Sequence, residues 1–137
     1  MSGLVLKLAP RERLLVNGAV IENGSRRSRI AVLTPKANIL RLRDAIHPEQ
    51  ATSPVRRVVY IAQMVLSGDA SEDSAKSELL RGIEQLSQAL TDPDSRNHLA
   101  QATACVLSGD FYRALKSLRA LMPREDRLLS AYPGPVL

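Results

Sequence analysis

Residues 16–32 read VNGAVIENGSRRSRIAV, and this stretch decides the fold of the first third of the chain. Two Asn-Gly pairs, at positions 17–18 and 23–24, bracket the apolar run 19–21. Asn-Gly is the strongest short-range hairpin signal, because both central residues of a type I′ turn take positive φ angles. The stretch therefore predicts two tight turns, the second of which opens into a strand that ends near Leu33.

Three further runs have the pattern of short strands: residues 4–8, 13–16 and 38–43. In the last run, two leucines (Leu40, Leu42) alternate with two arginines (Arg41, Arg43), which predicts leucines on one face of a strand and arginines on the other. The connections between the runs are short enough to require antiparallel pairing. We therefore expect an antiparallel sheet of four to five short strands in residues 4–43.

The hydrophobic period changes near residue 50 from that of strands to that of helices. Four segments, which start near residues 54, 71, 93 and 110, have apolar residues at helical spacing. The buried positions are expected to include Leu79, Ile83, Leu86, Leu115 and Leu118. The predicted fold class is α+β. Its parts are a basic sheet region (1–47), a linker (48–54), a lobe of about four helices (55–130) and a loose tail (131–137).

The sequence VLSGD occurs at residues 65–69 and again at 106–110. In each copy the Gly suits the left-handed position after a helix, and the Asp (Asp69, Asp110) suits the N-cap of the next helix. Ser53 before Pro54 predicts another N-cap. The repeat fits two stacked helical hairpins with a tetratricopeptide-like rhythm, or a plain four-helix lobe packed on the sheet, which we favour.

Positive charge is concentrated in the first part of the chain. Residues 1–57 contain eleven Lys or Arg and four Asp or Glu, a net charge of +7. Residues 58–137 contain eight basic and ten acidic residues, a net charge of −2. This asymmetry indicates a polyanionic partner for the first part, or a contact between the two parts or between subunits.

Three arginines follow the second Asn-Gly pair at once: Arg26, Arg27 and Arg29. The planar guanidinium group donates hydrogen bonds in a fork that matches phosphate and carboxylate. We expect these three residues to contact a polyanion, with four further arginines as secondary candidates: Arg41, Arg43, Arg56 and Arg57. The alternative is a solvated edge strand whose charges prevent edge-to-edge pairing.

The sequence gives little support for catalysis. His47 and His98 have no partners at metal-ligand spacing, and the single Cys105 lies in an apolar run where a packed thiol is expected. No glycine-rich phosphate-binding motif is present. We therefore expect no enzyme, no metal and no cofactor. Neither a signal peptide nor a bilayer-spanning run is evident, so no membrane contact and a cytoplasmic location are expected.

Two blocks of sequence resemble the FlbT family, the flagellar biosynthesis repressors of alphaproteobacteria. The first block is NGAVIENGSRR at residues 17–27. The second is ANILRLRDAI at residues 37–46, followed by PEQATSPVRR at residues 48–57. A third, less specific block combines YRAL at residues 112–115 with DRL at residues 126–128. Together the blocks resemble the family over nearly the whole chain.

The resemblance implies a cytosolic, post-transcriptional regulator of flagellin synthesis. Such a protein would bind the 5′ untranslated leader of flagellin mRNA and repress its translation or promote its decay. The resemblance also implies action opposite or alongside a second small protein, FlaF. It carries over no catalytic residues.

Two classes of partner remain open. Contacts from Lys and Arg to phosphate supply most nucleic-acid affinity, which favours RNA. The first aromatic residue is Tyr60, however, so the basic part has no aromatic face on which bases could stack. The alternative is a protein-binding regulator or chaperone-like cofactor that holds flagellin or FlaF through its helical lobe. A continuous basic face on the folded protein would favour RNA as the partner, whereas arginines paired with acidic residues would favour a protein.

Homo-oligomerisation is also expected, because a short open sheet would gain from pairing of its edges.

Overall fold

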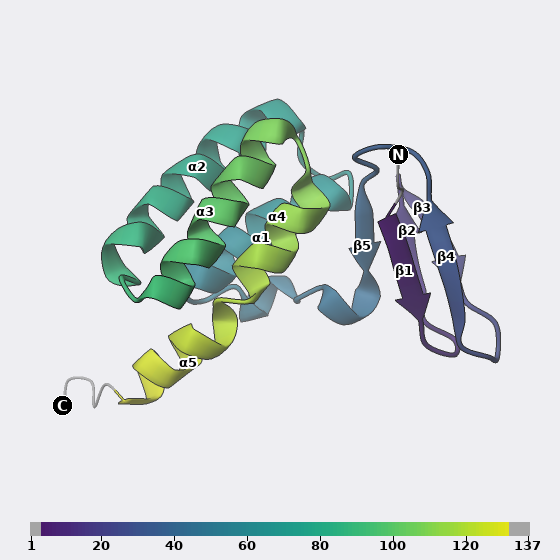
Figure 1. Cartoon of the computed structure of the whole chain (residues 1–137), viewed down its shortest axis with the longest axis horizontal. Helices are drawn as coiled ribbons and strands as arrows, with labels where there is room; N and C mark the ends of the chain where they lie inside the picture. Colours follow the sequence, from purple (N-terminus) through teal and green to yellow (C-terminus); the bar gives the residue numbers. More distant parts are fainter. Residues whose placement is uncertain (1–3, 132–137) are drawn as a thin grey trace.

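The computed structural model describes residues 4–131, which form a sheet region followed by a helical lobe (Figure 1). The strands are β1 (Leu4–Leu8), β2 (Arg13–Val16), β3 (Ala19–Glu22), β4 (Ser28–Val32) and β5 (Ile39–Arg41). The helices are α1 (Pro54–Leu66), α2 (Glu72–Ala89), α3 (Pro93–Ser108), α4 (Phe111–Arg119) and α5 (Met122–Ala131), with 3-10 turns at Leu42–Asp44 and Pro48–Gln50. The predicted α+β class and the change from strands to helices near residue 50 are confirmed.

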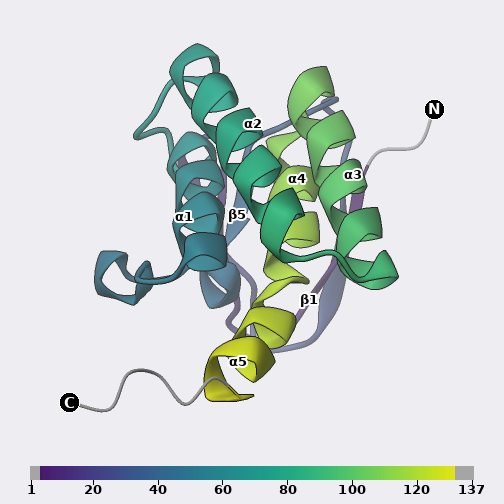
Figure 2. The same cartoon turned by 90° about the vertical axis from the view of Figure 1, so that its left-hand side faces the viewer.

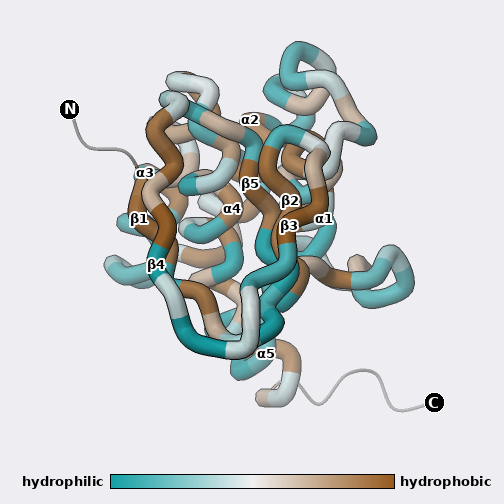
Figure 3. Tube along the Cα trace, turned by 90° about the vertical axis from the view of Figure 1, so that its right-hand side faces the viewer, coloured by the Kyte–Doolittle hydropathy of each residue, from teal (hydrophilic) through white to brown (hydrophobic). Residues whose placement is uncertain are grey.

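The strands form two antiparallel sheets rather than one. β1 pairs with β4, and β2 lies between β3 and β5. Figure 3 shows both sheets on one side of the molecule, with the helices behind them. The sheets share a core, because Leu6 and Leu8 of β1, Leu14 of β2 and Ile39 of β5 are each at most 3% exposed.

The first Asn-Gly pair forms the predicted hairpin turn. Asn17 has φ 47° and Gly18 has φ 86°, as a type I′ turn requires, and Val16 pairs with Ala19 across it. The turn is also attached to the start of β5. The Asn17 amide donates to the Asn38 carbonyl at 2.8 Å, and the Asn38 amide donates to Asn17 Oδ1 at 2.9 Å.

The second Asn-Gly pair does not form a hairpin turn, so this prediction is wrong. Neither Asn23 nor Gly24 takes a positive φ angle. The Asn23 side chain is instead used for long-range hydrogen bonds. Its Nδ2 donates to the carbonyls of Ala9 at 2.7 Å and Arg26 at 2.9 Å, and its Oδ1 accepts from Ser28 Oγ at 2.7 Å. These bonds join the loop after β1 to the loop before β4.

The predicted alternation in residues 38–43 is also wrong. Ile39, Leu40 and Arg41 are all buried, whereas Leu42 is 44% exposed. The strand is covered on both faces, because β5 contacts α1 and the Arg41 side chain reaches the Lys7 carbonyl of β1. Leu42 begins a 3-10 turn, in which the strand period no longer applies.

The first four helices form a closed bundle. α1 packs on α2 and α4, and α3 packs on the same two helices (Figure 2). Contact between α1 and α4 distinguishes a four-helix bundle from two stacked hairpins. The favoured prediction of a plain four-helix lobe is therefore confirmed. The five residues predicted to be buried, which are Leu79, Ile83, Leu86, Leu115 and Leu118, are each at most 4% exposed. None of the helices within residues 4–131 is long and apolar enough to span a bilayer.

The repeated Gly-Asp pair behaves differently in its two copies. Gly109 has φ 80° at the end of α3, and Asp110 Oδ1 accepts the Arg113 amide at 3.1 Å, as predicted for an N-cap. Gly68 has φ 86° after α1, but Asp69 accepts from Ser67 Oγ rather than capping α2. Ser71 caps α2 instead, so the prediction for Asp69 is wrong.

Asp110→Ala is expected to destabilise the protein by about 0.5–2 kcal/mol, because the first turn of α4 loses the acceptor for the Arg113 amide. Chemical denaturation measures this change, with Asp69→Ala as the matched control. Asp69 caps no helix, so its replacement is expected to have the smaller effect. Equal losses for the two variants would contradict the different roles of the two Asp residues.

The segment after α4 forms a fifth helix, α5, which extends to Ala131, the first residue of the predicted loose tail. Pro123 lies in the first turn of α5, where its missing amide hydrogen costs nothing. Glu125 ties α5 to α1. Its Oε1 accepts from Ser53 Oγ at 2.5 Å and its Oε2 accepts the Val55 amide at 2.8 Å. Ser53 therefore makes no cap bond of its own. Residues 132–137 of the predicted tail lie outside the described part.

Candidate nucleic-acid interface

The outer face of the β1–β4 sheet carries two cations directly opposite one another. Side chains alternate along β1, so Leu6 and Leu8 are buried while Lys7 is exposed. The strand register pairs Lys7 with Arg29 of β4, which is also exposed. Like charges placed directly opposite on two strands destabilise a sheet. The pair is thus not explained by stability, and it is well placed to hold an anion.

An open groove of about 1150 Å³ is lined by the buried Arg41 and by four cations with exposed side chains: Lys7, Arg27, Arg29 and Arg43. We call these four side chains the basic groove. Within residues 4–131, no carboxylate lies within 4.0 Å of Lys7, Arg27 or Arg29. Arg43 Nε lies 3.7 Å from Glu12, a carboxylate that a closer arginine already neutralises. The groove therefore keeps a net positive charge.

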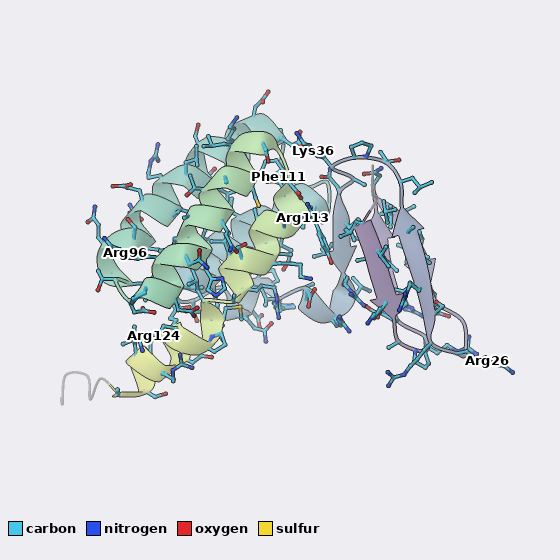
Figure 4. All side chains as sticks on the ribbon, in the orientation of Figure 1. Arg26, Lys36, Arg96, Phe111, Arg113 and Arg124 are labelled. Atoms are coloured by element: carbon cyan, nitrogen blue, oxygen red, sulfur yellow. The ribbon has the colours of Figure 1, made fainter. Side chains whose placement is uncertain are left out.

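The loops at one end of the groove are held in place by the hydrogen bonds of Asn23. Besides these side-chain bonds, the Arg11 amide donates to the Gly24 carbonyl at 2.9 Å, and the Asn23 amide donates to the Glu12 carbonyl at 2.8 Å. Arg27 therefore follows a fixed backbone. Arg26 lies at the tip of the same loop and points away from the protein (Figure 4), so it is exposed but does not line the groove.

Arg41 has a structural role that the sequence did not indicate. Its Nε lies 2.6 Å from Glu12 Oε2, its Nη2 lies 2.8 Å from Glu12 Oε1, and the same Nη2 donates to the Lys7 carbonyl. Both side chains of this ion pair are at least nine-tenths buried. The guanidinium group of Arg41 lowers the pKa of Glu12 to about 2, and Glu12 raises the pKa of Arg41. Arg41 joins β5 to β1 and is not free to bind a phosphate.

Arg56 and Arg57 lie on α1 and do not line the basic groove. Arg56 forms two hydrogen bonds with Asp126, of 2.7 Å and 3.2 Å, which raise the pKa of Arg56 and lower that of Asp126. Arg57 is exposed and lines a different groove, between α1 and α2. Of the seven arginines selected from the sequence, the structure places three in the basic groove with open donors: Arg27, Arg29 and Arg43.

Two important residues were missed by sequence reasoning. Lys7 is the only cation of its strand, and nothing in its local pattern shows that Arg29 lies opposite it. Glu12 is one acid among many cations, and its partner Arg41 is 29 positions away in the sequence. Lys7 would have been found only from the register between β1 and β4, which are not consecutive strands. No local signal reveals the role of Glu12.

The His, Cys, Asp and Glu side chains of residues 4–131 were the other candidates for a site. Within the described residues, no three His, Cys, Asp or Glu side chains are grouped so that they could hold a metal ion. Cys105 is partly buried, and burial raises the pKa of its thiol, which disfavours the nucleophilic thiolate. The basic groove is thus the chemically distinctive feature of the described surface.

The sequence matches the family model described as flagellar protein FlbT over residues 4–129. The chain belongs to the FlbT family. This confirms the resemblance seen in the sequence. A probable flagellum biosynthesis repressor protein FlbT of Caulobacter sp. (strain K31) is 31% identical over 126 residues, which cover 92% of this chain and 95% of that protein.

Further FlbT relatives show a similar level of identity. The flagellum biosynthesis repressor protein FlbT of Caulobacter vibrioides (strain ATCC 19089 / CIP 103742 / CB 15) is 29% identical, over 92% of this chain and 89% of that protein. A probable FlbT repressor of Brucella ovis is 30% identical, over 93% of this chain and 83% of that protein. No solved structure matches the chain. The matched segment contains both sheets and the complete four-helix bundle.

Proposed function

We propose that this FlbT family member is a post-transcriptional regulator of flagellin synthesis that binds the 5′ untranslated leader of flagellin mRNA through its basic groove. Binding there would repress translation or promote decay of the mRNA, in the cytoplasm. The observation that carries the proposal is the pairing of Lys7 with Arg29 in a groove that also contains Arg27 and Arg43. The names of the relatives, which describe repression of flagellum biosynthesis, support the regulatory part.

The groove suits a phosphate backbone better than individual bases. Its exposed charged groups are one ammonium and three guanidinium groups, which contact phosphate oxygens without regard to sequence. The first aromatic residue of the chain is Tyr60, on α1, so bases cannot stack on aromatic rings in the sheet region. Arg27 and Arg29 could stack on exposed bases through their guanidinium planes. Affinity is then dominated by electrostatics and depends strongly on salt.

Loss of two groove cations is expected to weaken RNA binding and reduce its salt dependence. For Arg27→Ala/Arg29→Ala, the slope of log affinity against log salt should fall in magnitude by about 1.4 for a single-stranded leader and about 1.8 for a base-paired one. Titration of the variant and the wild-type protein with flagellin leader RNA at several salt concentrations measures both quantities.

The matched control is Arg81→Ala/Arg96→Ala. This variant loses the same charge from exposed residues of α2 and α3, and Figure 4 shows Arg96 at the end of the molecule opposite the strands. We expect its salt slope to equal that of the wild-type protein. An unchanged slope in the groove variant, or an equal change in both variants, would exclude the groove as the RNA site.

A second candidate function is supported by the groove between α1 and α2. This groove, of about 420 Å³, has Val58, Ile61 and Leu86 on its walls, and its charged residues are two arginines and one glutamate: Arg57, Arg81 and Glu78. Such a surface fits an amphipathic helix with acidic flanks, and flagellin or FlaF would be held there in a protein-binding regulator. Pull-down of flagellin and FlaF distinguishes the two functions. If Arg81→Ala/Arg96→Ala loses a partner while the basic-groove variant keeps it, the lobe has a separate binding role.

A further inference from the structure

Strand β3 leaves apolar side chains exposed on both of its faces. Val20 is 69% exposed and Ile21 is 39% exposed, although they are neighbours in a strand and so point in opposite directions. Among residues 4–131, β3 pairs with β2 on one side only and has no partner strand at its other edge. In Figure 3 the β2–β3 hairpin lies on the near side of the molecule, with hydrophobic segments in both strands.

The exposed residues continue apolar rows that begin in the core. Leu40 of β5, Leu15 of β2 and Val20 of β3 lie opposite one another in register. Leu40 is 3% exposed, Leu15 is partly buried and Val20 is mostly exposed, so burial is lost along the row towards the free edge. On the other face, Ile21 of β3 lies opposite Leu14 of β2, and Leu14 is fully buried whereas Ile21 is 39% exposed. A further strand beside β3 would extend both rows.

The backbone of β3 shows which groups a further strand would meet. In a hairpin with a two-residue turn, the residues beside the turn, Val16 and Ala19, form a hydrogen-bonded pair, and such pairs then alternate. The bond from the Asn23 amide to the Glu12 carbonyl follows this alternation. The amide and carbonyl groups of Val20 and Glu22 therefore point away from β2, towards the free edge.

We propose that two copies of this protein pair through their β3 strands, antiparallel and across a two-fold axis, to form one continuous sheet of six strands. Val20 of each copy then lies opposite Glu22 of the other, and these residues exchange hydrogen bonds through the four outward-pointing amides and carbonyls. Ile21 lies opposite Ile21 of the second copy, on the axis. The inference concerns a surface other than the basic groove and does not depend on RNA binding.

A second copy fits this edge because the edge is complementary to itself. The two outward-pointing residues, Val20 and Glu22, are separated by one position, so a two-fold axis through Ile21 satisfies all of their backbone groups at once. The charge of Glu22 is no obstacle. Its carboxylate lies 2.8 Å from Arg13 Nε and 3.7 Å from Arg11 Nη1, so each copy brings a compensated charge to the interface.

A proline substitution separates pairing from folding. Val20→Pro removes an amide that points to the free edge and bonds to no group of β2, so the hairpin ladder is kept. We expect the wild-type protein to sediment as a dimer that dissociates on dilution, and Val20→Pro to sediment as a folded monomer, with helix content checked by circular dichroism. Leu33→Lys removes another apolar side chain, 78% exposed outside β3, and should remain dimeric.

Disulfide formation tests the register without relying on a destabilised variant. In a Cys105→Ser background, Ile21→Cys places two thiols opposite each other at a non-hydrogen-bonded position, where Cα atoms are about 4.5 Å apart and within disulfide range. Mild oxidation should link Ile21→Cys into covalent dimers, whereas Leu33→Cys should form no covalent dimer. A wild-type protein that stays monomeric at all concentrations, or a dimer that persists in Val20→Pro and is not trapped by Ile21→Cys, would overturn the inference.

Discussion

Glu12→Gln is expected to destabilise the protein by about 3 kcal/mol, because it leaves the buried guanidinium group of Arg41 without a counter-charge. Glutamine has nearly the same shape as glutamate, so the loss reports charge rather than packing. The affected pair joins the β1–β2 loop to β5, and the Arg41 bond to the Lys7 carbonyl also depends on its position. Urea denaturation of the variant and the wild-type protein measures the difference.

The matched control for this prediction is Glu22→Gln. Glu22 also forms an ion pair with arginines, at 2.8 Å from Arg13, but the side chains of this pair are 40% and 62% exposed. Solvent screens such a pair, so its removal should have a much smaller effect than Glu12→Gln. Equal losses for the two variants would show that the Glu12–Arg41 pair does not hold the two sheets together.

The same pair predicts how stability depends on pH. The pKa of Glu12 is lowered in the folded protein from 4.5 to about 2, mainly by its hydrogen bonds to Arg41. A lowered pKa contributes stability above the unfolded value, and this contribution is lost as pH falls from about 4.5 towards 2. The difference in stability between wild type and Glu12→Gln should therefore shrink over this range. A difference that is constant with pH would contradict the assignment.

Charge reversal in the basic groove is expected to weaken RNA binding by about two orders of magnitude. Lys7→Glu/Arg29→Glu removes two contacts to phosphate, each worth roughly 1.5 kcal/mol, and adds repulsion. The same change replaces a like-charged cross-strand pair by another like-charged pair, so the stability of the sheet should change little. Binding of flagellin leader RNA and thermal melting, measured on the same samples, separate the two effects.

The control for charge reversal makes the same change in net charge at a distance from the basic groove. Arg81→Glu/Arg96→Glu changes the net charge by the same amount on α2 and α3. If long-range attraction alone held the RNA, both variants would lose affinity equally. We expect the control to lose only the small part of the affinity that comes from net charge.

Local sequence signals predicted the structure correctly where it depends on residues close to one another in the sequence. Asn17-Gly18 forms the predicted turn because its requirement for positive φ is met by those two residues alone. Gly109 and Asp110 likewise end α3 and begin α4 as predicted, since a cap involves residues within one helical turn. The helical stripe through Leu79, Ile83 and Leu86 was visible for the same reason.

Predictions failed where a distant residue replaced a local partner. Ser53 is a residue type that is common at N-caps, but its hydroxyl donates to Glu125, 72 positions later. Glu125 also accepts the Val55 amide in the first turn of α1. Asn23 has the composition of a turn residue, but its amide group joins two loops. Asp69 was displaced as a cap by Ser71, two residues further on.

The candidate site was predicted in part, for a related reason. Arg27 and Arg29 were identified because they follow one another in a basic segment of the sequence. Lys7 and Arg43 join them only through the β1–β4 register and the turn after β5, which no local pattern specifies. Conversely, Arg41 was assigned to the site because it is an arginine in a basic segment, whereas in the structure it neutralises Glu12.

Backbone amide chemical shifts recorded during titration with flagellin leader RNA test the central claim most directly, because they locate the bound RNA residue by residue. At low salt, the largest shifts should belong to Lys7, Arg27, Arg29 and Arg43 and to their neighbours in β1 and β4, with little change in α2 and α3. Shifts confined to the α1–α2 groove, or none at RNA concentrations that saturate binding, would contradict an RNA site in the basic groove.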